Sequence, residues 1–347
     1  MPYALPDSRV PDSMAAPALR WGILGPGWIA HRFVESLSKY SAQQVVAVAS
    51  RSQGRADEFA EAHSLDRAHG SYEALLADPE VDIVYVSTPH TEHHRCALAA
   101  IAAGKHVLVE KPLAVDAVRA SEIVTAAGEA GVFAGEAMWT KFLPKFDVIA
   151  QIVDSGILGE VRTVLVDHGE YFTTDHRIYD PTLAGGPLLD LGTYDASFIH
   201  SVLGAPTSLV AVGQPANDRL NGQVSAILTH SGGNQAVMNT TILSNTPTTA
   251  VICGRDATLT VDGPFFMPGS FTVDFRDGTT LEYLEEKGLQ VDGLHFAAVD
   301  AARNIAAGRL ESSVHTLADA VSTLTIIDTI RGQLGITDGP YAAAPMY

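Results

Sequence analysis

The stretch Leu19-Arg20-Trp21-Gly22-Ile23-Leu24-Gly25-Pro26-Gly27-Trp28-Ile29-Ala30 decides the fold of this chain. Residues 21–24 form an apolar run typical of a buried strand, and the apolar residues after Gly27 recur with helical spacing. Gly25 permits a sharp turn, and Gly27 lets backbone N–H groups approach a phosphate at the positive end of that helix. The stretch predicts a turn that holds a dinucleotide pyrophosphate, although an ordinary glycine-rich turn has the same pattern.

The residues up to about 140 continue as alternating strands and helices. We expect strands at 44–50, 81–86, 106–109 and 132–136, and helices at 55–63, 71–76, 92–103 and 116–130. This alternation is typical of a doubly wound parallel sheet of class α/β. Ligands bind such sheets at the carboxyl ends of the strands. Residues that follow a predicted strand are therefore candidate cofactor contacts, among them Thr88, Pro89 and His90.

The end of the second predicted strand bears on the choice of cofactor. An acidic residue there would bind the adenosine ribose hydroxyls of NAD, but the strand runs into Ser50 and Arg51, and Arg55 follows one helical turn later. Guanidinium groups bind phosphate through charge-assisted hydrogen bonds, which favours the 2′-phosphate of NADP. The alternative is that both arginines are solvated charges at a helix start.

Composition narrows the class of protein. The 347 residues are enough for two domains, and a formal net charge of −18 argues against general binding to nucleic acid or to anionic membranes. The chain has two distant cysteines and no apolar run long enough to span a bilayer, so we expect no metal site and a reducing, cytoplasmic location. Residues 1–18 read as a flexible arm, or as a segment that lies over a neighbouring subunit.

The second half of the chain has a different pattern. It predicts a helix at 146–155, a strand at 161–171, a polar loop at 173–183 and a helix from 187 to about 203. Six short strands follow between 208 and 275, and helices at 293–307 and 316–334 close the chain. The short strands with polar turns predict an antiparallel sheet. Asp190 and Tyr194 are four residues apart, so a continuous helix would place them on one face.

Several of these segments resemble the glucose–fructose oxidoreductase/inositol dehydrogenase/MocA family. The matching pieces are residues 25–30, 71–76, 103–113 with its Glu110-Lys111-Pro112, and 185–194 with Asp190-Leu191-Gly192-Thr193-Tyr194. Residues 136–144 are most similar to the dihydrodiol dehydrogenase branch and to NADP-dependent sugar dehydrogenases. One departure is Phe296, where relatives of this branch tend to carry a hydroxylated aromatic residue.

The resemblance implies a fold, a reaction and an assembly. It implies a Rossmann domain followed by an α+β domain with a large open sheet, which we place at residues 19–138 and 139–347. It also implies hydride transfer between NADP, or less readily NAD, and a small sugar, polyol or trans-dihydrodiol. Its members often form dimers or tetramers through the second sheet, so we expect a homo-oligomer.

The resemblance also assigns residues. Tyr194 is the candidate acid/base and Lys111 its assistant, since a nearby ammonium lowers the pKa of a phenol that is otherwise near ~10, and Asp190 lies beside the substrate. Without the resemblance, Lys111 could equally be a solvated lysine at a strand end. His93 could likewise be a histidine packed in the core. The expected cofactor contacts are Gly25, Gly27, Trp28, Ile29, Ser50, Arg51, Arg55, Thr88, Pro89, His90, His93, Glu110, Lys111 and Trp139. The expected substrate contacts are Lys111, Trp139, His176, Arg177, Asp190 and Tyr194.

Two other functions are compatible with the same scaffold. One is a non-catalytic sensor that binds NADP, although a sensor has no need of the Lys111 and Tyr194 pair. The other is an enzyme that uses the nicotinamide transiently to hydrolyse or interconvert sugars.

Overall fold

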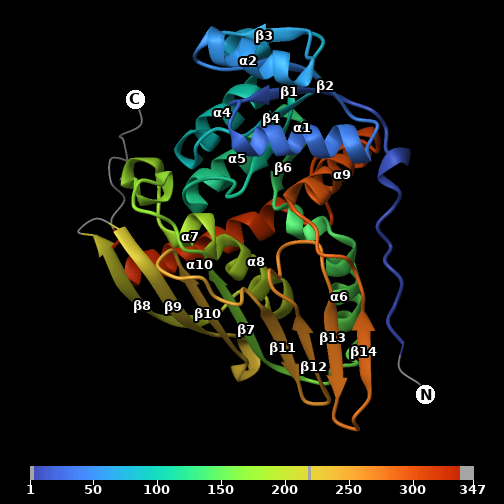
Figure 1. Ribbon diagram of the computed structural model, residues 1–347, viewed down its shortest axis with the longest axis vertical. Coiled ribbons are helices and arrows are strands. Elements are labelled where there is room, and N and C mark those ends of the chain that lie inside the picture. The colour runs from blue at the N-terminus through green and yellow to red at the C-terminus, as the bar shows by residue number, and fades with distance from the viewer. Residues whose placement is uncertain (1–3, 218–219, 337–347) are drawn as a thin grey trace. The chain divides into compact units, whose positions relative to one another are not determined.

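The computed structural model describes residues 4–217 and 220–336, and the chain divides into two compact units. The parallel-sheet unit comprises residues 10–143 and 288–321. The mixed-sheet unit comprises residues 144–287 together with the described parts of the two chain ends, 4–9 and 322–336. Each unit is built around its own sheet (Figure 1).

The parallel-sheet unit has a six-stranded sheet in the order β3-β2-β1-β4-β5-β6, in which every paired strand is parallel. The strands are β1 (Arg20–Leu24), β2 (Gln44–Ala49), β3 (Arg67–His69), β4 (Ile83–Val86), β5 (His106–Glu110) and β6 (Ala134–Ala137). This is the strand order of the dinucleotide-binding doubly wound fold. The predicted α/β class is confirmed. Strand β3 was not expected, because its three residues contain no apolar run.

The helices of this unit confirm the expected alternation. They are α1 (Trp28–Tyr40), α2 (Gln53–His63), α3 (Tyr72–Leu76), α4 (His90–Ala102), α5 (Ala117–Ala130) and α9 (Leu294–Ala306). Two of these helices begin with a side-chain cap at the expected position. The side chain of Ser71 accepts a hydrogen bond from the N–H of Ala74 at the start of α3, and that of Asp116 accepts one from the N–H of Arg119 at the start of α5. Helix α9 comes from the C-terminal third of the chain.

Residues 288–321 join the parallel-sheet unit through side-chain bonds that sequence patterns do not reveal. Ser36 of α1 accepts a hydrogen bond from the backbone N–H of His295 at 3.0 Å, and Tyr40 donates to Asp292 at 2.5 Å. The ring of Trp139 packs against Gly293, where an added Cβ would lie 2.6 Å from the indole. The units are therefore discontinuous in sequence, whereas the expected division at 138/139 used two unbroken segments.

The mixed-sheet unit has eight strands in the order β14-β13-β12-β11-β7-β10-β9-β8. They are β7 (Val161–Gly169), β8 (Ser208–Asn217), β9 (Leu220–Thr229), β10 (Gln235–Thr241), β11 (Ala250–Gly254), β12 (Ala257–Val261), β13 (Phe271–Phe275) and β14 (Thr280–Tyr283). Strands β7 and β10 pair in parallel and the other neighbours pair antiparallel. The open, mainly antiparallel sheet is confirmed, and β14 is an addition to it.

The helices of the mixed-sheet unit include one correction. They are α6 (Pro144–Ser155), α7 (Pro187–Asp190) and α8 (Gly192–Leu203), and α10 (Leu317–Gln333) passes from one unit into the other. A single helix over 187–203 was wrong, because the chain is interrupted at Leu191, whose φ and ψ are −103° and −51°. Asp190 and Tyr194 therefore belong to two helices and do not share one continuous helical face.

The two faces of the mixed sheet differ in burial. On β7 the side chains of Val164, Val166 and His168 are buried on the face that α8 covers. The opposite face carries exposed apolar side chains, described below with the proposed assembly. The strand expected at 161–171 is thus confirmed over Val161–Gly169, and its side chains alternate in burial.

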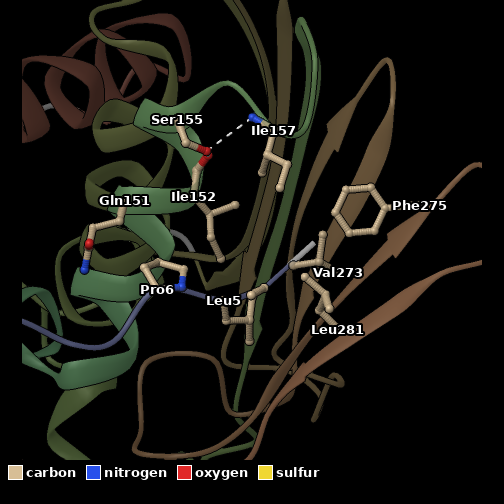
Figure 2. Close-up of a pocket in the computed structure, with 10 residues that line it drawn as sticks. Leu5, Pro6, Gln151, Ile152, Ser155, Ile157, Val273, Phe275 and Leu281 are labelled. Carbon is tan, nitrogen blue, oxygen red and sulfur yellow. Dashed lines mark hydrogen bonds between the residues drawn. The ribbon is translucent and has the colours of Figure 1, made fainter. Parts of the chain in front are cut away.

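Residues 4–9 of the N-terminal arm pack against α6, whereas the arm from residue 10 onward belongs to the parallel-sheet unit. The guanidinium and backbone N–H of Arg9 donate to the carboxylate of Asp147 at 2.6–3.0 Å, and Gln151 donates to the carbonyl of Asp7. Figure 2 shows Leu5 and Pro6 facing the apolar side chains of α6, β13 and β14 across a cavity of about 330 Å³. None of the expected site residues lines this cavity.

Among the described residues, no helix has both the length and the apolar character needed to cross a lipid bilayer. Nor does this part of the chain gather three or more His, Cys, Asp or Glu side chains where they could hold a metal ion.

Candidate functional site

The turn between β1 and α1 has the geometry of a phosphate cradle. Gly25 has a φ of +94°, and a Cβ there would lie 3.1 Å from both the carbonyl oxygen of Ser87 and the backbone nitrogen of Thr88. Gly27 is the N-cap of α1, with a Cβ position 3.8 Å from the nearest atom outside its own turn. A side chain at Gly25 would thus collide with the backbone of the turn after β4, so the tight turn between β1 and α1 requires glycine at this position. The residues present fit a dinucleotide.

The first turn of α1 carries the next two expected cofactor contacts. Trp28 is 60% exposed, with the guanidinium of Arg32 5.9 Å from the centre of its ring, and Ile29 follows it in the helix. Backbone N–H groups of this turn have no partner within the helix, as in every helix start. They are available to an anion.

The end of β2 is polar and basic, as the sequence indicated. Ser50 is buried and accepts from the N–H of Ser52 at 3.3 Å. Arg51 and Arg55 are exposed, and within residues 4–217 and 220–336 neither forms an ion pair. Two guanidinium groups therefore remain available beside this strand end.

The turn that follows β4, residues 87–90, contains buried polar side chains at the carboxyl edge of the sheet. Thr88 and His90 are buried, and Pro89 is the N-cap of α4. His93, one turn further, is fully buried: its Nδ1 lies 2.7 Å from the carbonyl oxygen of Pro112 and its Nε2 2.9 Å from that of Thr88. This histidine thus links two backbone turns.

The segment that follows β5 is held by two buried glutamates. The carboxylate of Glu110 accepts from the hydroxyl of Tyr85 and, at 3.2 Å, from the N–H of Lys111. The N–H of Leu113 donates to Glu136 at 2.6 Å, and Glu136 pairs with His315 at 2.7 Å. Burial raises the pKa of Glu110 to about 7, while the hydroxyl of Tyr85 and the charge of Lys111 act to lower it. Lys111 itself is partly exposed.

Trp139 lies in the buried core rather than on the surface. It is 1% exposed and begins a short 3-10 helix, Trp139–Phe142. Its ring packs against Gly293 and Leu143 lies beside it. A contact of this indole with ligand remains an expectation.

The expected substrate residues lie in the mixed-sheet unit, except Lys111 and Trp139. Arg177 pairs with the carboxylate of Asp190 at 3.1 Å, so an exposed guanidinium covers the end of α7. His176 is exposed, stacks on Phe172 and accepts from the N–H of Ile178. These three polar groups surround the loop that leads into α7.

Tyr194 is 7% exposed and belongs to an aromatic cluster that was not expected. Its ring stacks on Phe266, with the ring centres 4.8 Å apart. His168 of β7 also stacks on Phe266, at 4.5 Å, and its ring centre lies 5.7 Å from that of Tyr194. His168 also pairs with Glu170 at 3.1 Å. The sequence signal was a histidine in register with Val164 and Val166 on the inward face of a strand. Phe266 lies in a loop and had no such signal.

Asp195, the neighbour of Tyr194, was also overlooked. It is fully buried, and within the described chain neither carboxylate oxygen has a hydrogen-bond partner. Burial raises the pKa of Asp195 well above its ordinary value, and Asp167 adds to the effect.

Two family models match the chain. The model described as the oxidoreductase family with a NAD-binding Rossmann fold matches residues 19–137, and the model of the GFO/IDH/MocA C-terminal domain matches residues 146–260. The first match coincides with the strand order and cradle of the parallel-sheet unit.

Proteins of known activity are similar over nearly the whole chain. The trans-1,2-dihydrobenzene-1,2-diol dehydrogenase of Danio rerio is 35% identical over 329 residues, which is 92% of this chain and 98% of that protein. The same enzyme of Xenopus tropicalis is 32% identical over 330 residues, covering 92% and 99%.

Solved structures share the fold. KijD10, a 3-ketoreductase from Actinomadura kijaniata in complex with TDP-benzene and NADP, has a TM-score of 0.78 at 26% identity, covering 92% of this chain and 98% of that one. Levoglucosan dehydrogenase in complex with NADH and levoglucosan has a TM-score of 0.82 at 18% identity, with the same coverage.

Proposed function

Because this chain belongs to the GFO/IDH/MocA family of NAD(P)-binding oxidoreductases, we propose that it interconverts a secondary alcohol and its carbonyl with NADP. The proposed substrate is a sugar, a polyol or a trans-dihydrodiol. The observation that carries this proposal is the glycine cradle at Gly25 within a chain that matches dihydrodiol dehydrogenases over 92% of its length. The nicotinamide, when bound, supplies the hydride chemistry.

Tyr194 is proposed as the acid/base group. Oxidation of an alcohol requires a group that takes the hydroxyl proton, and a phenol near pKa ~10 is poorly matched to neutral pH unless a positive charge favours its ionised form. Lys111 is the proposed source of that charge. Support comes from the burial of Tyr194 and from the bonds that hold the backbone of residues 110–113. The two residues belong to different units.

Recognition of the substrate is proposed for the polar groups around α7. Asp190 would accept a substrate hydroxyl, and its pairing with Arg177 orients the carboxylate at the end of α7. His176 and Trp139 complete the proposed contacts. The exposed position of Arg177 and His176 is compatible with a pocket for a hydroxylated ligand.

NADP is proposed as the preferred cofactor. The end of β2 offers Ser50 and two exposed arginines, Arg51 and Arg55, in place of an acidic residue. The remaining proposed contacts are Gly25, Gly27, Trp28, Ile29, Thr88, Pro89, His90, His93, Glu110, Lys111 and Trp139.

A homo-oligomer through the outer face of the mixed sheet is also proposed. Val210, Ile227, Val237, Leu165 and Val251 are consecutive partners across five adjacent strands. The first four are exposed large apolar side chains. A continuous apolar row on an open sheet is typical of an interaction site, and a second copy would bury it symmetrically.

The experiment that tests the function is a spectrophotometric screen of the purified chain. NADP+ is offered with panels of aldoses, inositols and trans-dihydrodiols, and NADPH with the corresponding carbonyl compounds. We expect turnover with at least one class. Binding of NADP without turnover on every panel would favour a sensor, and NADP retained through purification would favour transient use of the nicotinamide.

A further inference from the structure

His93 makes two short contacts that a neutral imidazole cannot both satisfy. Its Nδ1 lies 2.7 Å from the carbonyl oxygen of Pro112, and its Nε2 lies 2.9 Å from the carbonyl oxygen of Thr88. Both distances are those of ordinary hydrogen bonds. Carbonyl oxygens only accept, so each ring nitrogen must donate.

A neutral imidazole carries one N–H, and its other nitrogen presents a lone pair. In either neutral tautomer of His93, that lone pair would face a carbonyl oxygen at hydrogen-bond distance in a fully buried site. The doubly protonated ring satisfies both contacts. We therefore propose that His93 is a buried imidazolium that clamps the turn at Pro112 to the turn at Thr88 and so positions Lys111.

The surroundings of His93 act in both directions on its charge. The pKa of His93 is lowered overall, chiefly by burial and also by the charge of Lys111, whereas the carbonyls of Pro112 and Thr88 and the carboxylate of Glu136 act to raise it. On its own helix, His90 lies edge-on at 5.5 Å.

The other titratable groups near the turn after β5 come from β5, β6 and the segment that contains His315. Glu110 precedes this turn on β5, and His315 pairs with Glu136 of β6 at 2.7 Å. The carboxylate of Glu136 thus supplies the negative charge that favours the proposed cation. The hydrogen-bond geometry decides between the opposing influences, because only the cation leaves no lone pair against a carbonyl.

The clamp matters for Lys111 because of the backbone around it. The N–H groups of Lys111 and Leu113 donate to Glu110 and Glu136. Pro112 between them has no N–H, so its carbonyl is the one backbone group through which it can be tethered, and His93 occupies that carbonyl. The ring also reaches Thr88, so the turn after β5 is tied to the turn after β4. The link to Lys111 rests on the proposed function.

The protonation state is measured on the full wild-type chain by 15N NMR of histidine-labelled protein. At about pH 8 a free imidazole, with a pKa near ~6.5, is neutral. We expect one histidine whose two nitrogens both show the shift of a protonated nitrogen, assigned through the ring or by its loss in His93→Gln. A His93 with one protonated and one unprotonated nitrogen at that pH would overturn the proposal.

The positioning role is measured by turnover and cofactor binding. His93→Leu should lower kcat by about 10- to 100-fold, the scale of a misplaced catalytic group, and by a larger factor than it weakens NADP binding. His93→Gln should recover part of the loss in kcat because its amide still donates. His94→Gln is the matched control, since His94 is the next residue of α4 and pairs with Glu122 of α5 at 2.6 Å instead of with the two turns. Unchanged kcat in His93→Leu would refute positioning.

The two failures can be told apart. If Lys111→Ala kept full turnover, the proposed role of Lys111 would fail while the 15N result stood. If His93→Leu did not fold, the spectrum of the wild-type chain would still decide the charge.

Discussion

Tyr194 and Lys111 carry the chemistry proposed at the scale of single residues. Loss of the Tyr194 hydroxyl should lower kcat by roughly 100-fold or more, and so should loss of the Lys111 ammonium. This is the usual contribution of acid–base groups. NADP should still bind, because the other proposed cofactor contacts are unchanged in both variants; binding should be weaker in Lys111→Ala, since Lys111 is itself a proposed contact. The variants Tyr194→Phe and Lys111→Ala are compared by steady-state kinetics and by titration with NADPH, whose fluorescence reports binding.

Tyr171→Phe is the control for the phenol, since Tyr171 is an exposed tyrosine of the same unit. It should leave kcat unchanged. Near-normal turnover in both Tyr194→Phe and Lys111→Ala would contradict the assignment.

Arg51 should decide the preference between the two dinucleotides. Loss of a charge-assisted contact to the 2′-phosphate should weaken NADP about 10- to 100-fold, whereas NAD lacks that phosphate and should bind about as before. Arg51→Ala is titrated with both cofactors, with Arg162→Ala of the mixed-sheet unit as a control. Equal losses for NADP and NAD would remove the cofactor proposal.

Glu110 should make stability depend on pH. Burial raises its pKa from 4.5 to about 7, so the folded state holds the proton more tightly than the unfolded chain does. The stabilisation is complete below about pH 4.5 and is lost as pH rises through about 7, by on the order of 1–3 kcal/mol. Glu110→Gln keeps an acceptor for Tyr85 and should flatten that part of the profile. Urea unfolding of both proteins between these pH values checks it, and parallel profiles would disprove it.

At the scale of elements, the turn between β1 and α1 depends on one glycine more than on the other. A Cβ at Gly25 would meet backbone atoms at 3.1 Å with φ at +94°, whereas a Cβ at Gly27 would meet its nearest neighbour at 3.8 Å. Gly25→Ala should therefore cost about 1–3 kcal/mol of stability and weaken the dinucleotide. Gly27→Ala is the matched control and should cost less stability. Thermal unfolding with and without NADP measures both, and equal losses would count against the cradle.

Helices α7 and α8 show where the sequence pattern stops being informative. Their apolar residues fit one helix, yet the chain breaks at Leu191 between Asp190 and Tyr194. Helix α7 follows Gly186, whose φ of +100° sets the direction of entry. Helix α7 packs mainly on β9, whereas α8 packs on β7 and β10, so the main partner strands of the two helices differ. The periodicity of apolar residues along one helix contains no information about this packing.

At the scale of the whole molecule, the apolar row on the mixed sheet should hold two copies of the chain together. Ile227 and Val210 are adjacent members of that row. Ile227→Lys and Val210→Lys should lower the molecular mass in solution toward that of one chain, since a buried ammonium opposes association. Sedimentation velocity measures the mass.

Val118→Lys is the matched control for this prediction, because Val118 and Val210 are both 69% exposed valines in different units. It should leave the mass unchanged. A wild-type chain that sediments as a single copy would contradict the proposed assembly.

The sequence by itself determined the local and repetitive features of this protein. The strand, glycine turn and helix at residues 20–40, the alternation that builds the parallel sheet, and the caps at Ser71 and Asp116 follow from neighbours a few residues apart. So does the absence of an acidic residue after β2. These features depend on backbone sterics and on the period of apolar residues, which the linear chain records.

The tertiary structure decided what depends on residues far apart in sequence. It placed 288–321 with the parallel-sheet unit through bonds such as Ser36 with His295, paired β7 with β10 in parallel, and gathered Tyr194, His168 and Phe266. It also set both nitrogens of His93 against carbonyls from two different turns. Each of these rests on distances between segments that no periodicity encodes, because they arise only when the whole core is packed.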